Sequence, residues 1–276
     1  VFIDCTASEE VAAEHGRLLA AGISVVTANK VRLAGPREGY RSLVGPSPAR
    51  LYYETTVGAG LPVVRTLTDL LATGDRLHRL EGLFSGTLTY LMDRLTAGEP
   101  FSRALRQAYD LGLTEPDPRE DLSGRDVARK LLILGRLAGR DLEPEEVEVE
   151  PLLPPDPWNG LSLEALWQRL PEVDEAFARR AREAAAAGLR LVYLGSLGED
   201  RLEARLAEVP LDHPCARVSG TDNLIALTTD RYRQTPMVIQ GPGAGPEVTA
   251  AGVFTDLLRA VSERSQKAIP PPEPSR

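Results

Sequence analysis

The feature that most constrains the fold is a strand–helix–strand pattern over the first thirty residues. The apolar run 1–6 predicts a strand, residues 8–21 predict a helix with Ser8 at its cap, and the apolar run 23–27 predicts a second strand. Short, continuously apolar strands joined by a helix are typical of a parallel sheet that is covered on both faces. The sequence therefore predicts an α/β fold.

Polar residues follow both of these strands. Thr6 and Ser8 come after the first strand, and Asn29 and Lys30 come after the second. Ligands bind at the carboxyl ends of the strands in open parallel sheets, so these four side chains are predicted to converge on one site. The alternative is an ordinary strand-to-helix turn that is rich in capping residues.

The beginning of the chain looks like the second part of a Rossmann-type nucleotide-binding domain. Such a domain normally opens with a strand, a Gly-x-Gly-x-x-Gly turn and a helix, and an acid about twenty residues later binds the ribose. No such turn precedes Val1. We therefore expect residues 1–50 to be the remainder of this domain, in a natural chain that extends upstream.

The rest of the chain mixes helices with strands. The Gly/Pro/Ser-rich residues 36–48 predict a connection, and helical patterns cover 124–139 and 162–187. The predicted strands are 77–84, 189–197, 201–209, 223–229 and 237–240.

These elements suggest a second domain after the partial parallel sheet. Residues 51–240 are expected to form this α+β domain, because helices and strands are mixed there. The segment 241–265 contains a last helix that we expect to complete the first domain, and residues 266–276 are expected to be a disordered tail.

The basic residues are strongly biased, with 29 arginines and only three lysines, Lys30, Lys130 and Lys267. Arginine stays protonated at any pH that a protein meets, whereas a lysine ammonium can hand over a proton when it is buried. We therefore predict lysine chemistry at Lys30 and Lys130, which lie in dense polar motifs. The alternatives are a coding drift toward arginine, which we accept for Lys267, and structural ion pairs.

Lys130 lies on the helix predicted over 124–139. Apolar residues recur along this helix at helical spacing, which predicts one buried face. Asp126 and Lys130 lie at the rim of that face and are expected to form a partly buried i,i+4 pair. A pair of this kind on an open surface contributes only about 0.3–0.5 kcal/mol, so the alternative is a simple surface contact.

The loop before this helix is crowded with acidic residues. An anionic pocket with a lysine at its edge suits a substrate that carries an ammonium group and an oxygen that needs a proton donor. The acids are Glu115, Asp117, Glu120 and Asp121.

Composition excludes several classes of function. The net charge of -8 argues against a nucleic-acid partner, because phosphate binding needs clustered basic surface. No apolar run approaches the roughly 20 residues that a membrane span requires, so no membrane association is expected. Cys5 and Cys215 lie far apart without metal-ligand spacing, which fits a reducing cytosol. We expect a cytoplasmic protein.

Motifs spread over nearly the whole chain resemble those of the homoserine dehydrogenase family. Each motif is weak alone, but their occurrence together and in this order is specific. They are Asp-Cys-Thr at 4–6, Thr-Ala-Asn-Lys at 27–30, the glycine-rich loop 54–62, Ser-Gly-Thr at 85–87, the acidic loop 112–118, the helix segment 126–130, Gly-Thr-Asp-Asn at 220–223 and the turn 241–245 with Thr-Ala at 249–250.

The resemblance implies reversible hydride transfer between NADP or NAD and L-aspartate 4-semialdehyde, which gives L-homoserine for threonine and methionine biosynthesis. By the same resemblance, Lys130 would donate a proton to the substrate oxygen, and Lys30 would polarise that oxygen or hold the cofactor. Glu115 and Asp126 would bind the ammonium and hydroxyl ends of this small amino-acid substrate, supported by Asp121.

The resemblance also implies binding sites for the cofactor and for a sodium ion. The cofactor would be lined by Thr6, Ser8, Asn29, Lys30, Gly112, Gly241, Gly243 and Gly245. Sodium would be held by Glu54 and by the carbonyl groups of Val57, Ala59 and Leu61. The alternative is that the glycines of this loop serve only a tight strand-to-helix bend.

The sequence also bears on the assembly and the activity of the protein. Exposed sheet edges and the resemblance together predict a homodimer formed by the second domain, which also binds substrate. Two hypotheses stay open: an enzyme whose natural chain is longer, and a non-catalytic homologue or fragment that keeps the dimeric core. The intact Lys30, Asp126 and Lys130 favour the enzyme. NAD or NADP preference is not predicted, because the residue that contacts the ribose would lie upstream.

Overall fold

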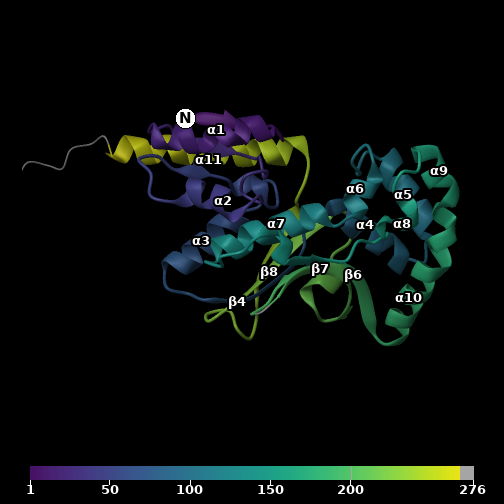
Figure 1. Ribbon diagram of the computed structural model, residues 1–276. Coiled ribbons are helices and arrows are strands. Elements are labelled where there is room, and N and C mark those ends of the chain that lie inside the picture. The colour runs from purple at the N-terminus through teal and green to yellow at the C-terminus, as the bar shows by residue number, and fades with distance from the viewer. Residues whose placement is uncertain (200, 268–276) are drawn as a thin grey trace, which may run out of the picture.

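The computed structural model describes residues 1–199 and 201–267, which contain a small parallel sheet and a larger mixed sheet (Figure 1). The helix α7 (Arg125–Leu137) lies between the N-terminal elements and the larger sheet. The predicted α/β fold is confirmed. The predicted disordered tail falls mostly on residues 268–276, outside the described residues. Among the described residues, no helix is both long enough and apolar enough to cross a membrane.

The small sheet is parallel, with strand order β1-β2-β3. Its strands are β1 (Phe2–Asp4), β2 (Val25–Thr27) and β3 (Leu51–Tyr52). The helix α1 (Glu9–Ala20) connects β1 to β2, and the Ser8 side chain accepts a hydrogen bond from the Val11 amide at 3.2 Å. The predicted parallel unit and its helix cap are confirmed.

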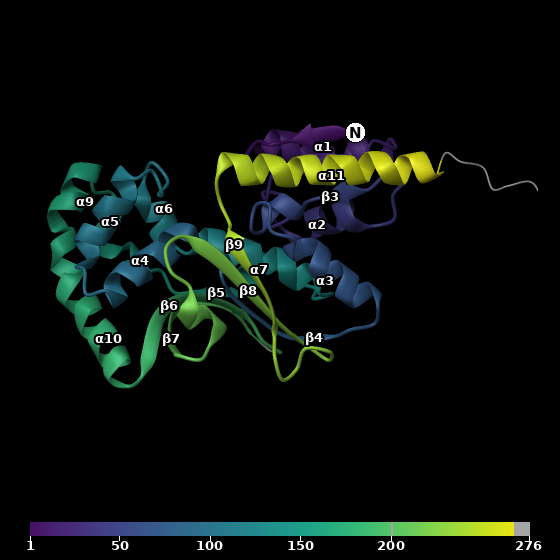
Figure 2. The same ribbon diagram turned by 180° about the vertical axis from the view of Figure 1, so that it is seen from behind.

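Helices cover both faces of this sheet. Successive side chains of a strand point to opposite faces, so Val25 and Val26 on β2 contact different helices. Val25 lies in the same core cluster as Leu19 of α1, whereas Val26 packs with Val253 of α11 (Pro246–Lys267). Figure 2 shows α11 running along the N-terminal elements, far in sequence from them.

The prediction that residues 36–48 form only a connection is wrong in part. The structure has a helix there, α2 (Arg37–Val44), with Pro36 at its N-cap position. Tyr40 and Leu43 lie three residues apart on one face of α2 and are buried. The helix was missed because it is short and flanked by glycine and proline, while its stability comes from this packing.

The larger sheet has the order β5-β7-β6-β4-β8-β9 and is antiparallel except for the β5–β7 pair. The hairpin predicted over 189–209 is confirmed as β6 and β7. The strands are β4 (Leu77–Leu83), β5 (Val147–Val149), β6 (Leu189–Leu197), β7 (Leu202–Pro210), β8 (Asp222–Thr229) and β9 (Met237–Pro242).

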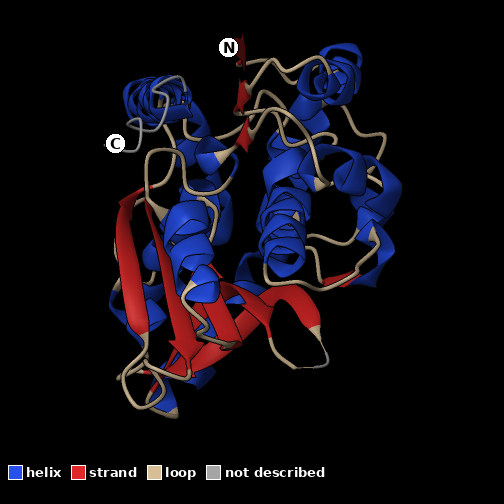
Figure 3. Cartoon of the chain, turned by 90° about the vertical axis from the view of Figure 1, so that its left-hand side faces the viewer, coloured by secondary structure: helices blue, strands red, loops and turns tan. Residues whose placement is uncertain are grey.

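Helices pack on one face of this sheet, and a short segment with a 3-10 turn covers the other, as Figure 3 shows in part. The helix predicted over 162–187 is interrupted, because Pro171 lies in a 3-10 turn between α9 (Leu163–Arg169) and α10 (Asp174–Ala186). The remaining helices are α3 (Val63–Ala72), α4 (Gly86–Thr96), α5 (Phe101–Asp110), α6 (Pro118–Leu122), α8 (Pro155–Trp158), α9 (Leu163–Arg169) and α10 (Asp174–Ala186), with 3-10 turns η1 (Glu54–Thr56), η2 (Pro144–Glu146), η3 (Leu170–Val173) and η4 (Pro214–Arg217).

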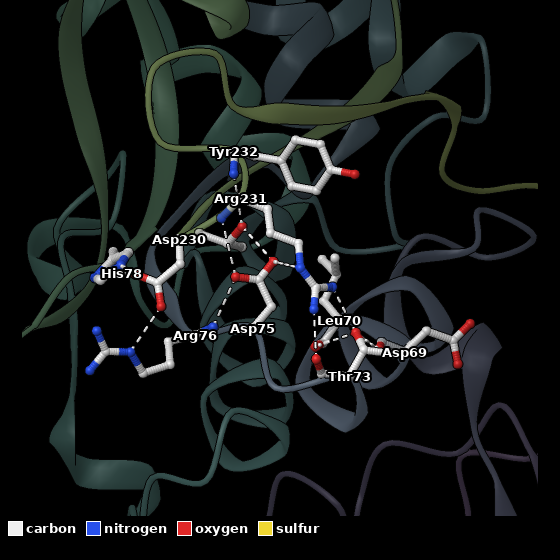
Figure 4. Close-up of polar contacts among 10 residues, drawn as sticks. Asp69, Leu70, Thr73, Asp75, Arg76, His78, Asp230, Arg231 and Tyr232 are labelled. Carbon is white, nitrogen blue, oxygen red and sulfur yellow. Dashed lines mark hydrogen bonds and ion pairs between the residues drawn. The ribbon is translucent and has the colours of Figure 1, made fainter.

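Polar contacts fix the start of β4 against the end of β8 (Figure 4). The buried Asp75 carboxylate accepts hydrogen bonds from the Thr229 hydroxyl at 2.8 Å and from the Arg231 amide at 3.3 Å. Asp230 pairs with Arg76 at 2.9 Å and with His78 at 2.6 Å. These contacts set the register of β4, whose other end leads into Phe84.

Paired glycines allow the Phe84 ring to lie close to the sheet. Gly82 on β4 is paired with Gly195 on β6. A Cβ atom on Gly195 would lie 2.8 Å from Phe84 Cδ2 and 3.0 Å from Val127 Cγ1 on α7. The missing side chain therefore lets both Phe84 and α7 pack against β6.

Gly195→Ala should lower the free energy of unfolding by about 1–3 kcal/mol, because the added methyl group must displace the Phe84 ring or α7. Urea denaturation of the variant and the parent measures this change. Gly16→Ala on α1 is the control, since its Cβ would make only ordinary contacts with Ser42, at 3.7 Å from Oγ and 3.9 Å from the carbonyl oxygen. Equal midpoints for the Gly195 variant and the parent would show that the close packing is not required.

Candidate active site

Two lysines share one carboxylate at the centre of the site. Lys130 Nζ lies 2.8 Å from Asp126 Oδ2, one turn away on α7. Lys30 Nζ, from the loop after β2, lies 3.3 Å from Asp126 Oδ1. The structure thus brings together Lys30, Asp126 and Lys130, the three residues that the sequence singled out. Helical spacing indicated the contact between Asp126 and Lys130, but it gave no information on the contact between Lys30 and Asp126.

The two ammonium groups determine the charge state of Asp126. Burial by itself raises the pKa of a carboxyl group, but the attraction of Lys130 and Lys30 outweighs it and holds the pKa of Asp126 below its ordinary value. Asp126 is therefore ionised at neutral pH. Two positive charges against one negative charge leave this point of the site with a net positive charge.

A main-chain carbonyl group fixes the position of Lys130. The buried Nζ atom donates a hydrogen bond to Phe84 O at 2.6 Å, and the Asn223 side chain donates to the same oxygen at 3.3 Å. An ammonium group has three hydrogens, so Lys130 keeps one after serving Asp126 and Phe84. That hydrogen has no partner among the described residues.

The acidic loop before α7 lies close to Asp126, with which it lines a cavity. Asp121 accepts hydrogen bonds from the Glu115 amide at 2.8 Å and from the Thr87 hydroxyl at 3.1 Å. Burial raises the pKa of Asp121. Glu115 is exposed, so its carboxylate is open to a ligand.

The acidic loop and Asp126 line one cavity of about 250 Å³. A larger cavity, of about 710 Å³, lies between α2, α3 and α11, but none of the predicted substrate-binding carboxylates lines it. We therefore assign the candidate site to the smaller cavity. Its lining residues are Ser85, Leu88, Glu115, Glu120, Asp121, Arg125, Asp126, Val127 and Arg129.

A buried aspartate holds together the carboxyl ends of β1 and β2. Asp4 accepts hydrogen bonds from the Thr6 amide at 2.8 Å and from the Asn29 side chain at 3.0 Å, and His15 Nε2 lies 2.9 Å away. Both amide hydrogens of Asn29 are used, since the second bonds Ser8 O at 2.9 Å. The Asn29 side chain thus links the two strand ends, and Thr6, Ser8 and Asn29 stay predicted cofactor contacts.

The predicted cofactor glycines occupy different backbone environments. Gly112 follows α5 with φ 69°, a conformation that favours glycine at a helix end, and open space surrounds it. Gly243 lies directly against the Asn223 side chain, so any larger residue would displace that amide. Gly241 and Gly245 also have φ angles that side chains rarely adopt. Contact of these glycines with a cofactor stays a prediction.

The predicted sodium loop contains a buried carboxylate with structural partners. The two oxygens of Glu54 accept hydrogen bonds from the Val64 and Arg65 amides of α3, at 2.7 and 3.0 Å. Arg259 lies 3.6 Å from the same carboxylate. Each Glu54 oxygen keeps a second lone pair. Among the described residues, no group of three or more His, Cys, Asp and Glu side chains could hold a metal.

Sequence reasoning missed two parts of the site. Phe84 contributes only its carbonyl oxygen, which no residue type reveals. Asn223 was seen only as part of a motif, although it is buried and its Oδ1 atom has no partner among the described residues. The signal for Asn223 was an amide at the start of a strand, a place where such side chains are depleted.

Comparisons with known proteins place this geometry in a family. A profile described as homoserine dehydrogenase matches residues 62–258. The chain is 45% identical to the chloroplastic bifunctional aspartokinase/homoserine dehydrogenase 2 of Zea mays over 95% of its own length, but it spans only 29% of that protein. It is 40% identical to the homoserine dehydrogenase of Paracoccidioides brasiliensis, covering 95% of this chain and 74% of that protein.

A solved structure supports the same conclusion. The structure of a hyperthermophilic archaeal homoserine dehydrogenase in complex with NADPH is similar to this chain, with a TM-score of 0.71 and 26% sequence identity. The match covers 95% of this chain and 71% of the archaeal chain.

Asp126→Asn should lower the stability of the folded protein at neutral pH, and this loss of stability should become smaller in acid. The folded-state pKa of Asp126 is lowered, so its contribution is fully present above the unfolded pKa of about 3.9 and is lost as the pH falls through the folded value. The difference in urea midpoint between parent and variant should be steady from about pH 7 to 5 and shrink below about pH 4.

The control for this measurement is Asp69→Asn, which alters an exposed i,i+4 pair with Arg65 and should change the midpoint little. A difference for the Asp126 variant that persists unchanged at pH 3 would contradict the assignment of a low pKa to Asp126.

Proposed function

The chain belongs to the homoserine dehydrogenase family, and we propose that it catalyses reversible NAD(P)-dependent hydride transfer between L-aspartate 4-semialdehyde and L-homoserine. The observation that carries the proposal is the cluster of Lys130, Lys30 and Asp126. It joins two ammonium groups to a cavity that is lined with further carboxylates. This combination suits a substrate with both an ammonium group and a reducible carbonyl group.

Lys130 is the proposed proton donor. A bound nicotinamide cofactor would supply the hydride for reduction of the semialdehyde, and the carbonyl oxygen would then need a proton. The free N–H of Lys130 supplies it, while the contacts with Phe84 O and Asp126 hold the ammonium group in place. In the reverse direction the same nitrogen accepts the proton of the homoserine hydroxyl group.

The acidic residues of the cavity are proposed to orient the substrate. Glu115 presents an open carboxylate to the substrate ammonium group, and Asp121 holds the Glu115 backbone through its amide. Lys30 adds a second positive charge next to the reacting oxygen, which stabilises negative charge as it develops there. NADP is a candidate cofactor beside NAD, because a similar archaeal structure is described as a complex with NADPH.

We also propose a sodium ion in the loop between Glu54 and Leu61. Among the described non-glycine residues, only Ala59 has φ in the left-handed region, at 53°. Such backbone strain is characteristic of sites where a loop binds a ligand. Glu54 and the carbonyl groups of Val57, Ala59 and Leu61 would hold the ion.

We further propose that the protein forms a homodimer. The strand β9 lies at the edge of the larger sheet, and its Val238 side chain is 43% exposed. An apolar edge strand that is left unpaired can pair with another chain.

The alternative function is a non-catalytic homologue that keeps the dimeric substrate-binding core. No specific observation favours it, because Lys30, Asp126 and Lys130 are all present and in contact with one another through Asp126.

Light scattering on folded protein at micromolar concentration should return twice the 29.9 kDa mass of one chain. Val238→Lys should shift the mass toward a single chain if the β9 edge forms the interface, because a charged side chain opposes edge pairing. A parent protein that scatters as one chain would rule out the dimer.

Glu54→Gln tests the sodium ion. A bound ion stabilises the folded protein, so the melting temperature of the parent should rise more in sodium chloride than in choline chloride at equal ionic strength. The variant should lose this difference, because it lacks the only side-chain charge offered to the ion. If parent and variant respond alike to both salts, Glu54 serves only to cap α3.

Lys130→Arg should lower turnover of homoserine by about 100-fold or more while cofactor binding is retained, because an arginine cannot exchange a proton at neutral pH. Steady-state kinetics and a separate cofactor titration measure the two quantities. Lys267→Arg is the matched control, since Lys267 lies in none of the polar motifs. Turnover of the Lys130 variant within a few-fold of the parent would refute the proton-donor role.

A further inference from the structure

Arg136 is buried on α7 in surroundings that offer it little compensating charge. Its side chain is 1% exposed, and the nearest carboxylate oxygen, on Glu143, is 4.0 Å away. The guanidinium group instead donates to carbonyl oxygens, at 2.7 Å to Leu33, 2.7 Å to Gly35, and 3.1 and 2.9 Å to Leu142. Two of these carbonyl groups belong to the loop that begins with Lys30.

Burial of the charged Arg136 side chain costs free energy, so we expect its hydrogen bonds to hold particular backbone segments in place. Removal from water opposes the charged form and lowers the pKa of Arg136. A well-packed apolar side chain often stabilises a core as much as a buried charge does. What only a guanidinium group provides is a planar set of five donors, which reaches carbonyl groups from two segments at once.

Contacts within the loop between Asn29 and Gly35 connect the carbonyl groups that Arg136 binds to the backbone of Lys30. The Ala34 amide donates to Lys30 O at 2.8 Å, and the Val31 amide donates to the Asn29 side chain at 2.9 Å. A Cβ on Gly35 would lie 2.9 Å from Val31 O, so the turn is closely packed. Fixing the carbonyl groups of the loop's end therefore fixes the backbone of Lys30 at its start.

Other contacts also link these segments, among them a hydrogen bond from the Arg37 amide to Glu143 Oε2 at 2.8 Å. Arg37 and Arg41 pair with Asp141 at 3.0 and 2.7 Å, but all three side chains are more than a third exposed. Exposed ion pairs contribute little to stability. Arg136 adds buried contacts between the loop and α7, and it also lies 5.2 Å from the centre of the Tyr40 ring.

We infer that Arg136 is a positioning residue for Lys30. It lies ten residues after Asp126, or about 15 Å along α7, so one helix binds the loop at two separate points. The carbonyl contacts of Arg136 place the loop, and Asp126 then receives the Lys30 ammonium group. The functional meaning of this arrangement rests on the proposed role of Lys30, but the arrangement itself is testable without turnover.

The presence of only three lysines permits a direct measurement. Trace acetylation of the native protein with acetic anhydride, followed by complete labelling after unfolding with an isotopically distinct reagent, gives a rate for each lysine by mass spectrometry. The rates of Lys30 and Lys130 are referred to that of Lys267. In Arg136→Met, the Lys30 rate should rise several-fold while the Lys130 rate stays within twofold of the parent, because Lys130 keeps its contacts with Asp126 and Phe84.

Three further variants define the result. Arg182→Met, which removes an exposed arginine, should leave both rates unchanged. Arg136→Lys covers the case in which the methionine variant does not fold, and it should also raise the Lys30 rate, since one ammonium group cannot reach both segments. An unchanged Lys30 rate in a folded Arg136 variant would overturn the inference, and so would equal increases at Lys30 and Lys130, which indicate general loosening. Turnover of Lys30→Ala tests the proposed function of Lys30 separately.

Discussion

The site depends on the carboxylate of Asp126, because it is the one negative charge that two lysines share. Lys30 comes from the loop after β2, and Lys130 comes from α7, which packs on the larger sheet. Two ammonium groups at this separation repel each other, and only a carboxylate between them makes their approach favourable. The ion pairs therefore join two parts of the fold at the point where the proposed chemistry takes place.

The position of Lys130 depends on how Phe84 and α7 pack against β6. Gly195 has no side chain, so the Phe84 ring and α7 both lie close to β6, and the carbonyl group of Phe84 is brought within 2.6 Å of Lys130 Nζ. Contacts of Asp75 and Asp230 at the start of β4 fix the strand that leads into Phe84. Lys130 is thus positioned by the Phe84 carbonyl group, which follows β4, and contacts at the opposite end of β4 set the register of that strand.

The sequence predicted the parts of this arrangement that are local in the chain. Helical spacing correctly placed Asp126 beside Lys130, and the strand–helix–strand pattern correctly predicted the parallel sheet. It did not predict that Lys30 meets Asp126, since that contact spans nearly a hundred residues and depends on how α7 packs. Helix α2 and the role of the Phe84 carbonyl group were missed for the same reason, because tertiary packing and backbone geometry leave little trace in residue type.

The two lysines differ in a way that suits different roles. The Lys130 side chain is 10% exposed and has two partners, Asp126 and the Phe84 carbonyl group. The Lys30 side chain is 29% exposed, and Asp126 is its one partner among the described residues. A proton donor must keep its geometry, while a charge that stabilises a developing alkoxide tolerates some movement. The cavity wall carries both signs of charge, because Asp126, Glu115, Glu120 and Asp121 line it together with Arg125 and Arg129. For the proposed substrate, which has an ammonium group and a reducible carbonyl group, these charges would favour one orientation before any specific hydrogen bond forms.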